Sequence, residues 1–170
     1  GERKIFINSI PSQRLNEEDH LIVETRYAQH FKRVVIEVTE EESRNAENLA
    51  KKINFIRNNG IQIALDDFGS GYSNEIRILS LLPDIIKIDM EMIQGIHNNV
   101  DKQNLVSNLV HFCHNKGVKV VAEGIEVQMD LATVIEMGVD YAQGFYLGRP
   151  AFEFSIIDPQ LRKEIRDLQK

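Results

Sequence analysis

Cysteine is almost absent from the 170-residue chain: Cys113 stands alone, which excludes an internal disulfide. A single thiol fits a reducing compartment, so we expect a cytoplasmic location, although a longer parent could be membrane-anchored through other domains. No window approaches the roughly 20 apolar residues of a membrane-spanning helix, and the first residues do not resemble a signal peptide. Basic residues are also in the minority, with 20 Lys and Arg against 26 Asp and Glu. This balance argues against a nucleic-acid polymer or an anionic membrane as the partner.

The remaining composition is that of a globular domain. Hydrophobic residues make up 42% and charged residues 27% of the chain, which is ordinary for a folded protein with a core. No low-complexity linker divides the sequence. We therefore expect one domain over residues 1–170.

Short apolar runs alternate with helical patterns along the whole chain. The runs are rich in Ile, Val or Phe and have the length of strands. The six predicted strands are Lys4–Asn8, Arg33–Glu37, Ile61–Asp66, Asp84–Lys87, Val118–Glu123 and Val139–Gln143. The predicted helices are one capped by Asn16, then Ser43–Asn59, Asn74–Leu82, Asp101–Lys116, Val127–Met137 and Pro159–Lys170.

Alternating strands and helices predict an α/β fold with a parallel sheet built from right-handed crossovers. Six units fit either an open doubly wound sheet or most of a (β/α)8 barrel. A complete barrel usually takes about 250 residues. The chain is therefore short of a complete barrel by about two units.

Polar side chains gather at the carboxyl ends of the predicted strands. Side chains alternate along each strand, so the polar residue lies on the same face as the apolar residue two positions before it. Parallel strands bring all their carboxyl ends to one rim. The residues are Asn8, Glu37, Asp66, Lys87, Glu123 and Gln143. A single strand-end Asp is more often a loop cap than a site, but six residues in one phase favour a functional rim.

Four negative charges at this rim, Glu37, Asp66, Asp67 and Glu123, are offset only by Lys87. Such a group is costly without counterions. Carboxylate and amide oxygens, without cysteine or clustered histidine, favour Mg²⁺ or Mn²⁺ over zinc. The adjacent aspartates could serve two metals, an arrangement that recurs in phosphoester hydrolysis.

The loop after the third strand reads Asp67-Phe68-Gly69-Ser70-Gly71-Tyr72-Ser73. Its two glycines allow a tight turn and a close approach of backbone N–H groups to a ligand. An ordinary loop that caps the next helix explains the same residues equally well. The pattern fits neither a P-loop nor a dinucleotide-binding fingerprint.

Several motifs in this order resemble the EAL domain family, the bacterial phosphodiesterases of cyclic di-GMP. The resemblance covers about Ile5 to Phe152 and rests on the following runs: Glu37-Val38-Thr39-Glu40, Asp66 to Ser73, Leu82-Pro83, Ile86-Lys87-Ile88-Asp89, Ala122 to Glu126, Gln143-Gly144-Phe145 and Gly148-Arg149-Pro150. It implies a modified (β/α)8 barrel that cleaves cyclic di-GMP to pGpG with Mg²⁺ or Mn²⁺.

The resemblance also implies roles for individual residues. Asn8, Glu37 and Asp66 resemble ligands of one metal, and Asp67 resembles a ligand of the second metal or its water. Lys87 and Glu123 resemble the groups that orient or deprotonate the attacking water, a choice that the sequence leaves open. The remaining matches concern substrate and loop positioning: Glu40, Gln143, Phe68, Gly69, Ser70 and Gly71.

The chain departs from the family at its start. It has no Glu-Ala-Leu motif and resembles the family from the third strand onward, so we expect an incomplete barrel, the C-terminal portion of an EAL domain. A metal-binding glutamate would then be missing, and the chain could be inactive by itself. Unpaired edge strands lead us to expect a homodimer or strand exchange. The alternative function is a non-catalytic EAL module that binds cyclic di-GMP or a protein partner.

Overall fold

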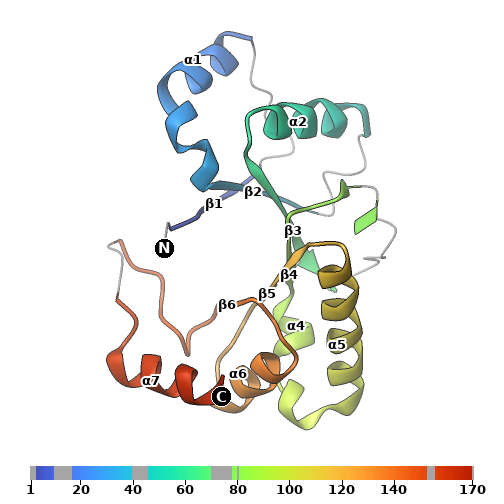
Figure 1. Ribbon diagram of the computed structural model, residues 1–170, viewed down its shortest axis with the longest axis vertical. Helices are drawn as coiled ribbons and strands as arrows, with labels where there is room; N and C mark the ends of the chain where they lie inside the picture. The colour runs from blue at the N-terminus through green and yellow to red at the C-terminus, as the bar shows by residue number, and fades with distance from the viewer. Residues whose placement is uncertain are drawn as a thin grey trace.

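The computed structural model of the protein (Figure 1) describes residues 3–9, 17–39, 46–69, 78–79, 81–152 and 156–169. The strands are β1 (Ile5–Asn8), β2 (Val34–Val38), β3 (Gln62–Phe68), β4 (Ile85–Ile88), β5 (Lys119–Ala122) and β6 (Tyr141–Ala142). The α-helices are α1 (Glu17–Tyr27), α2 (Ala46–Asn58), α4 (Met90–Ile93), α5 (Val100–Asn115), α6 (Gln128–Glu136) and α7 (Pro159–Leu168). Two 3₁₀ turns are η1 (Ala28–Arg33) and η3 (Ile96–Asn98).

The strands form one six-stranded sheet in sequence order, β1 to β6. Every neighbouring pair is parallel, and the sheet curls as it passes from β1 to β6 (Figure 1). This arrangement is a half-barrel, and it confirms the predicted α/β fold and partial barrel. The alternative of an open doubly wound sheet is wrong. In such a sheet the strand order reverses partway, whereas here each strand lies beside the next one in the sequence, as in a barrel.

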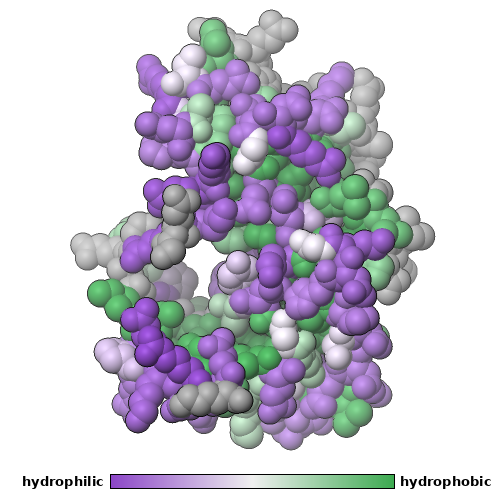
Figure 2. All heavy atoms as spheres, viewed as in Figure 1, coloured by the Kyte–Doolittle hydropathy of each residue, from purple (hydrophilic) through white to green (hydrophobic). Residues whose placement is uncertain are grey.

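Helices cover the outer face of the sheet (Figure 1), and the surface of the molecule is mostly hydrophilic on the face shown in Figure 2. The large buried cluster joins strand residues such as Ile63, Ile86 and Val120 to helix residues such as Val110 and Leu131. Cys113 of α5 is part of this cluster, and burial raises the pKa of its thiol to about 11. A thiol with such a pKa stays protonated at neutral pH and packs as a small apolar side chain.

The inner face of the curl carries a smaller apolar layer. Val35, Ala64, Ile85 and Val121 form a separate buried cluster, one residue from each of the strands β2 to β5. Because side chains on a strand alternate, the residue two positions further along each strand faces the same side. The inner apolar layer therefore lies directly below the rim residues Glu37, Asp66, Lys87 and Glu123.

All six predicted strands are present, with small shifts at their ends. The prediction of a strand over Val139–Gln143 is too long, since β6 holds only two residues. The Val139 N–H donates to Val134 O at the end of α6, so it is not available to the sheet. α5 begins at Val100 rather than Asp101, because the Asn99 side chain accepts from the Lys102 N–H and caps the helix.

Two predictions of helix starts, at Asn16 and Ser43, lie outside the described residues, as does most of the predicted helix Asn74–Leu82. Across the residues that the structure describes, none of the helices combines the length and apolar character that crossing a bilayer requires.

A buried carboxylate ties α6 to the turn that precedes α5. Asp130 is 2% exposed, and its oxygens accept from the Gly95 N–H at 3.0 Å, the His97 N–H at 3.2 Å and the His97 ring Nδ1 at 2.6 Å. Burial alone raises the pKa of this carboxyl, but the hydrogen bonds outweigh burial and hold the pKa below its ordinary value. No local pattern indicates this pair, because α5 separates its members along the chain.

We expect Asp130→Asn to lower the free energy of unfolding by about 2 kcal/mol at pH 7, since hydrogen bonds to a charged acceptor are worth about 1.5–3 kcal/mol. A depressed native pKa gives stability that is present above the unfolded pKa of about 3.9 and is lost as the pH falls through the native value. The two proteins should therefore converge in acid. Urea unfolding between pH 3 and pH 7 measures this, and a constant difference across that range would contradict it.

Candidate active site

One lysine and three carboxylates lie together at the carboxyl ends of β2 to β5. The Lys87 Nζ is 2.6 Å from Glu37 Oε1, 2.7 Å from Asp66 Oδ1 and 2.8 Å from Glu123 Oε1. The four side chains are between 8% and 16% exposed. Charges so close and so well shielded from water interact strongly, and we call these four residues the rim cluster.

The rim cluster arises from strand register. Glu37 pairs with Ala64 and Lys87 pairs with Val121 in the parallel ladders, so neighbouring strands end at similar heights. Glu123 follows the last residue of β5, and its N–H donates to Ile88 O. The curl of the sheet then turns these side chains toward one another on its inner face.

Asp67 joins the rim cluster through an irregular backbone. Neighbours in a regular strand point to opposite faces, but the register of β3 against β4 shifts between Leu65 and Phe68. Asp67 also has a φ of 55°, in the left-handed region that aspartate tolerates better than most residues. As a result, carboxylate oxygens of Asp66, Asp67 and Glu123 lie within 4.8 Å of one another.

The electrostatics of the site follow from this crowding. Burial by itself lowers the pKa of Lys87, but its hydrogen bonds to three carboxylates outweigh burial and raise the pKa above its ordinary value. Burial raises the pKa of Glu123, and its hydrogen bond to Lys87 offsets only part of that rise. Burial and then the charge of Asp66 raise the pKa of Asp67. The lysine therefore stays charged, while two carboxylates are more basic than usual.

Two predicted site residues occupy the edge strands rather than the rim cluster. Asn8 ends β1 in register with Glu37, but its side chain is exposed. Gln143 follows β6, where its N–H donates to Ala122 O, and its side chain is exposed as well. The structure thus places both at the same rim as the cluster, at its two ends.

The loop after β3 is described only as far as Gly69. Glu40, Ser70 and Gly71, which the resemblance assigns to substrate or loop positioning, lie outside the described residues. Gly69 has a φ of 106°, and a Cβ at this position would lie 2.7 Å from the Met92 side chain. The contact shows that α4 seats against the start of this loop, a role for Met92 that the sequence did not indicate.

An aromatic and a cationic side chain meet after β6. The Arg149 guanidinium lies 4.7 Å from the centroid of the Phe145 ring, a cation–π geometry. Phe145 remains 54% exposed. Its ring is therefore accessible to a partner even though one face meets the arginine.

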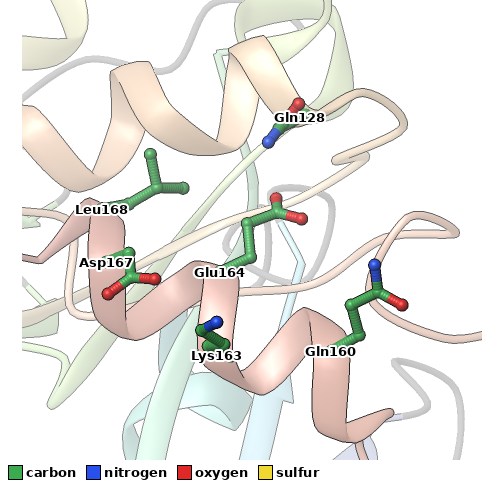
Figure 3. Close-up of a pocket in the computed structure, with 6 residues that line it drawn as sticks. All are labelled: Gln128, Gln160, Lys163, Glu164, Asp167 and Leu168. Atoms are coloured by element: carbon green, nitrogen blue, oxygen red, sulfur yellow. The ribbon is translucent and has the colours of Figure 1, made fainter.

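A pocket lies between α6 and α7 (Figure 3), and no residue of the rim cluster lines it. Its lining residues are Gln128, Gln160, Lys163, Glu164, Asp167 and Leu168. None of them is a predicted site residue. Glu164 accepts a hydrogen bond of 2.9 Å from the Tyr146 hydroxyl, which ties α7 to the segment after β6.

The carboxylates of the site have the chemistry that hard divalent cations require. Such ions take oxygen ligands, and the carboxylate oxygens of Asp66, Asp67 and Glu123 are close enough to share one. Lys87, at 2.7 Å from Asp66 and 2.8 Å from Glu123, uses oxygens of the same residues. The residue set therefore fits a divalent ion, with a lysine as its immediate neighbour.

Fold and site together define a class: a partial (β/α) barrel with a carboxylate-rich rim at the carboxyl ends of its strands. The sequence profile of the EAL domain matches residues 1–150. The chain belongs to the EAL domain family, which confirms the resemblance seen in its motifs.

Curated relatives of the chain are much longer than it is. It is 39% identical over 118 residues to the probable cyclic di-GMP phosphodiesterase PdeA of Escherichia coli, and 33% identical over 118 residues to the cyclic di-GMP phosphodiesterase PdeF of the same organism. Each match takes in 69% of this chain but only 16% of the relative. The chain thus corresponds to a small part of each relative.

Solved EAL structures share the fold. A manganese and cyclic di-GMP complex of Klebsiella pneumoniae BlrP1 aligns with a TM-score of 0.80 and 32% identity, covering 89% of this chain and 40% of BlrP1. A standalone EAL protein of Vibrio cholerae bound to cyclic di-GMP aligns with a TM-score of 0.82 and 27% identity, covering 94% and 70% of the two chains. Bacillus subtilis YkuI, in complex with cyclic di-GMP and calcium, gives 0.79 and 27%, covering 97% and 43%.

Proposed function

We propose that residues 1–170 are the C-terminal portion of an EAL domain that hydrolyses cyclic di-GMP to pGpG in the cytoplasm. The observation that carries the proposal is the rim cluster, with Asp67 beside it, in a chain whose structural neighbours hold cyclic di-GMP with manganese or calcium. A protein that served only as a scaffold would have no need to gather shielded carboxylates at a strand-end rim.

The proposed metal ligands are the oxygen-bearing side chains of the first three strands. Asn8, Glu37 and Asp66 would hold one Mg²⁺ or Mn²⁺ ion, and Asp67 the second ion or its water. Bound ions of this kind lower the pKa of water and neutralise charge on a phosphate. Asn8 is in register with Glu37, which supports their action on the same ion.

Lys87 and Glu123 take different parts in this proposal. Lys87 donates to carboxylates and has no lone pair while it is charged, so it orients and does not accept a proton. Glu123, at 2.8 Å from the Lys87 Nζ, is the carboxylate of the rim cluster that is not among the proposed metal ligands, and it would take the proton of the attacking water. Gln143, Glu40 and the loop Phe68–Gly71 would position the substrate.

The direct test is an assay of this chain with cyclic di-GMP and Mn²⁺ or Mg²⁺, followed by chromatography of the nucleotides. Formation of pGpG that depends on the metal supports the proposal. Binding of cyclic di-GMP without turnover would favour the alternative, a non-catalytic EAL module. Neither binding nor turnover, when a longer form of the protein has both, would mean that other segments complete the site.

We also propose that the chain associates with itself through its edge strands. β1 and β6 each pair on one side only within the described sheet, and Ile5, Phe6 and Ile7 are 42%, 40% and 45% exposed. Unpaired strands with apolar side chains invite pairing with another chain.

Light scattering across a concentration series should therefore show a dimer that Ile7→Lys weakens. Met129→Lys, at an exposed position on α6, is the matched control and should leave the association unchanged. A monomer at every concentration would contradict this prediction.

A further inference from the structure

The rim cluster is built around a single ammonium group. Lys87 lies on β4, between the strands that carry its carboxylate partners. An ammonium has three N–H donors, and Glu37, Asp66 and Glu123 each have an oxygen within 2.8 Å of the Nζ. The number of donors thus equals the number of carboxylates that they hold.

Two of these carboxylates, Glu37 and Asp66, are also proposed ligands of a divalent ion. Lys87 contacts both of them, and Asp66 also has an oxygen within 4.8 Å of oxygens of Asp67 and Glu123. An ion held by Glu37 and Asp66 would lie only a few ångströms from the Lys87 Nζ. Two cations so close, in a place shielded from water, repel each other strongly.

Lys87 also has little freedom to move away. The residue is 7% exposed, as is Glu37, and the inner apolar layer lies below it. Moving an ammonium into that apolar layer would be strongly unfavourable, because the charge would lose its carboxylate partners and its remaining hydration. Lys87 can therefore give up Glu37 and Asp66 only by turning toward Glu123, at the end of the neighbouring strand β5.

We propose that Lys87 is a built-in counter-cation of the metal site. It holds the rim carboxylates together in the metal-free protein, and a divalent ion must take Glu37 and Asp66 from it in order to bind. Lys87 thereby stabilises the fold and weakens the affinity for the ion at the same time. This inference rests on the proposed function, because it concerns the ion that the function requires.

The competition predicts opposite effects of one substitution on stability and on metal affinity. We expect Lys87→Met, which keeps the chain length but removes the charge, to melt at a lower temperature than wild type without metal. The same variant should bind Mn²⁺ at least about tenfold more tightly. Its melting temperature should rise more than that of wild type when Mn²⁺ is added.

Titration calorimetry with Mn²⁺ alone and thermal melts with and without Mn²⁺ measure these effects, and no nucleotide is needed. Lys87→Arg, which keeps the charge, should bind Mn²⁺ no more tightly than wild type. Lys119→Met removes a lysine that pairs with Asp140 at 2.6 Å, at the opposite ends of the strands. This control should leave Mn²⁺ affinity unchanged.

Equal or weaker Mn²⁺ binding by a folded Lys87→Met variant would overturn the proposal, as would the absence of binding to both proteins. Binding by the variant alone would support it. If Lys87→Met does not fold, Lys87→Gln decides by the same criteria, because its amide can still donate to the carboxylates. Failure of the proposed function would instead show as absent turnover of cyclic di-GMP with Mn²⁺ binding retained.

Discussion

Asp66→Asn is expected to lower metal-dependent hydrolysis of cyclic di-GMP by a factor of about 100 or more, in this chain or in any longer form that contains it. Loss of groups that merely support metal ligands costs about 10- to 100-fold, and Asp66 is proposed as a ligand itself. Its oxygens are close both to Lys87, at 2.7 Å, and to the oxygens of Asp67 and Glu123. Removing its charge weakens the attraction of this side chain both for Lys87 and for the proposed metal ion.

The fold should survive this change. Asparagine has nearly the same volume as aspartate and can still accept from Lys87, and Glu37 and Glu123 keep the lysine paired, so we expect a folded protein with a somewhat lower melting temperature. Asp101→Asn, on the first turn of α5, is the matched control and should keep full activity. Turnover by Asp66→Asn within a few fold of wild type would contradict the assignment of this residue.

Gly144→Ala is expected to lower the free energy of unfolding by about 3 kcal/mol or more, at the upper end of the cost of overpacking. A Cβ at this position would lie 2.2 Å from the carbonyl oxygen of Ile125 and 2.3 Å from its backbone nitrogen. Ile125 is fully buried, and its N–H donates to Gln143 O. Backbone held in this way cannot move aside as a flexible side chain can.

The glycine four residues later provides the control for this prediction. A Cβ on Gly148 would meet nothing within 4 Å, so Gly148→Ala should change the stability by no more than about 0.5 kcal/mol. Urea unfolding of the two variants beside wild type measures the difference. Equal stability of the two variants would mean that the contact between Gly144 and Ile125 is not tight in solution. Gly144→Ala should also displace Gln143, the preceding residue, from its place at the rim.

The rim could be predicted from the sequence because alternation in a strand is a local property. Glu37, Asp66, Lys87 and Glu123 each follow an apolar residue of the same phase, and that phase is readable without knowing which strands are neighbours. The repeated order of strand and helix then implied parallel neighbours with all their carboxyl ends at one side. Strand ends were less certain, since capping and loop hydrogen bonds such as that of Val139 to Val134 decide them.

The sequence by itself therefore determined the class of fold, the face of each strand and the family, because these depend on periodicity and on motifs that lie within short stretches. Only the tertiary structure decided which charges touch. Asp67 reaches the cluster through a register shift and a left-handed backbone, and Lys87 meets three carboxylates because the sheet curls. The pairing of Asp130 with His97 and the close approach of Gly144 to Ile125 likewise depend on how separate elements pack. Contacts between distant segments are set by the geometry of packing, which no local pattern of residues records.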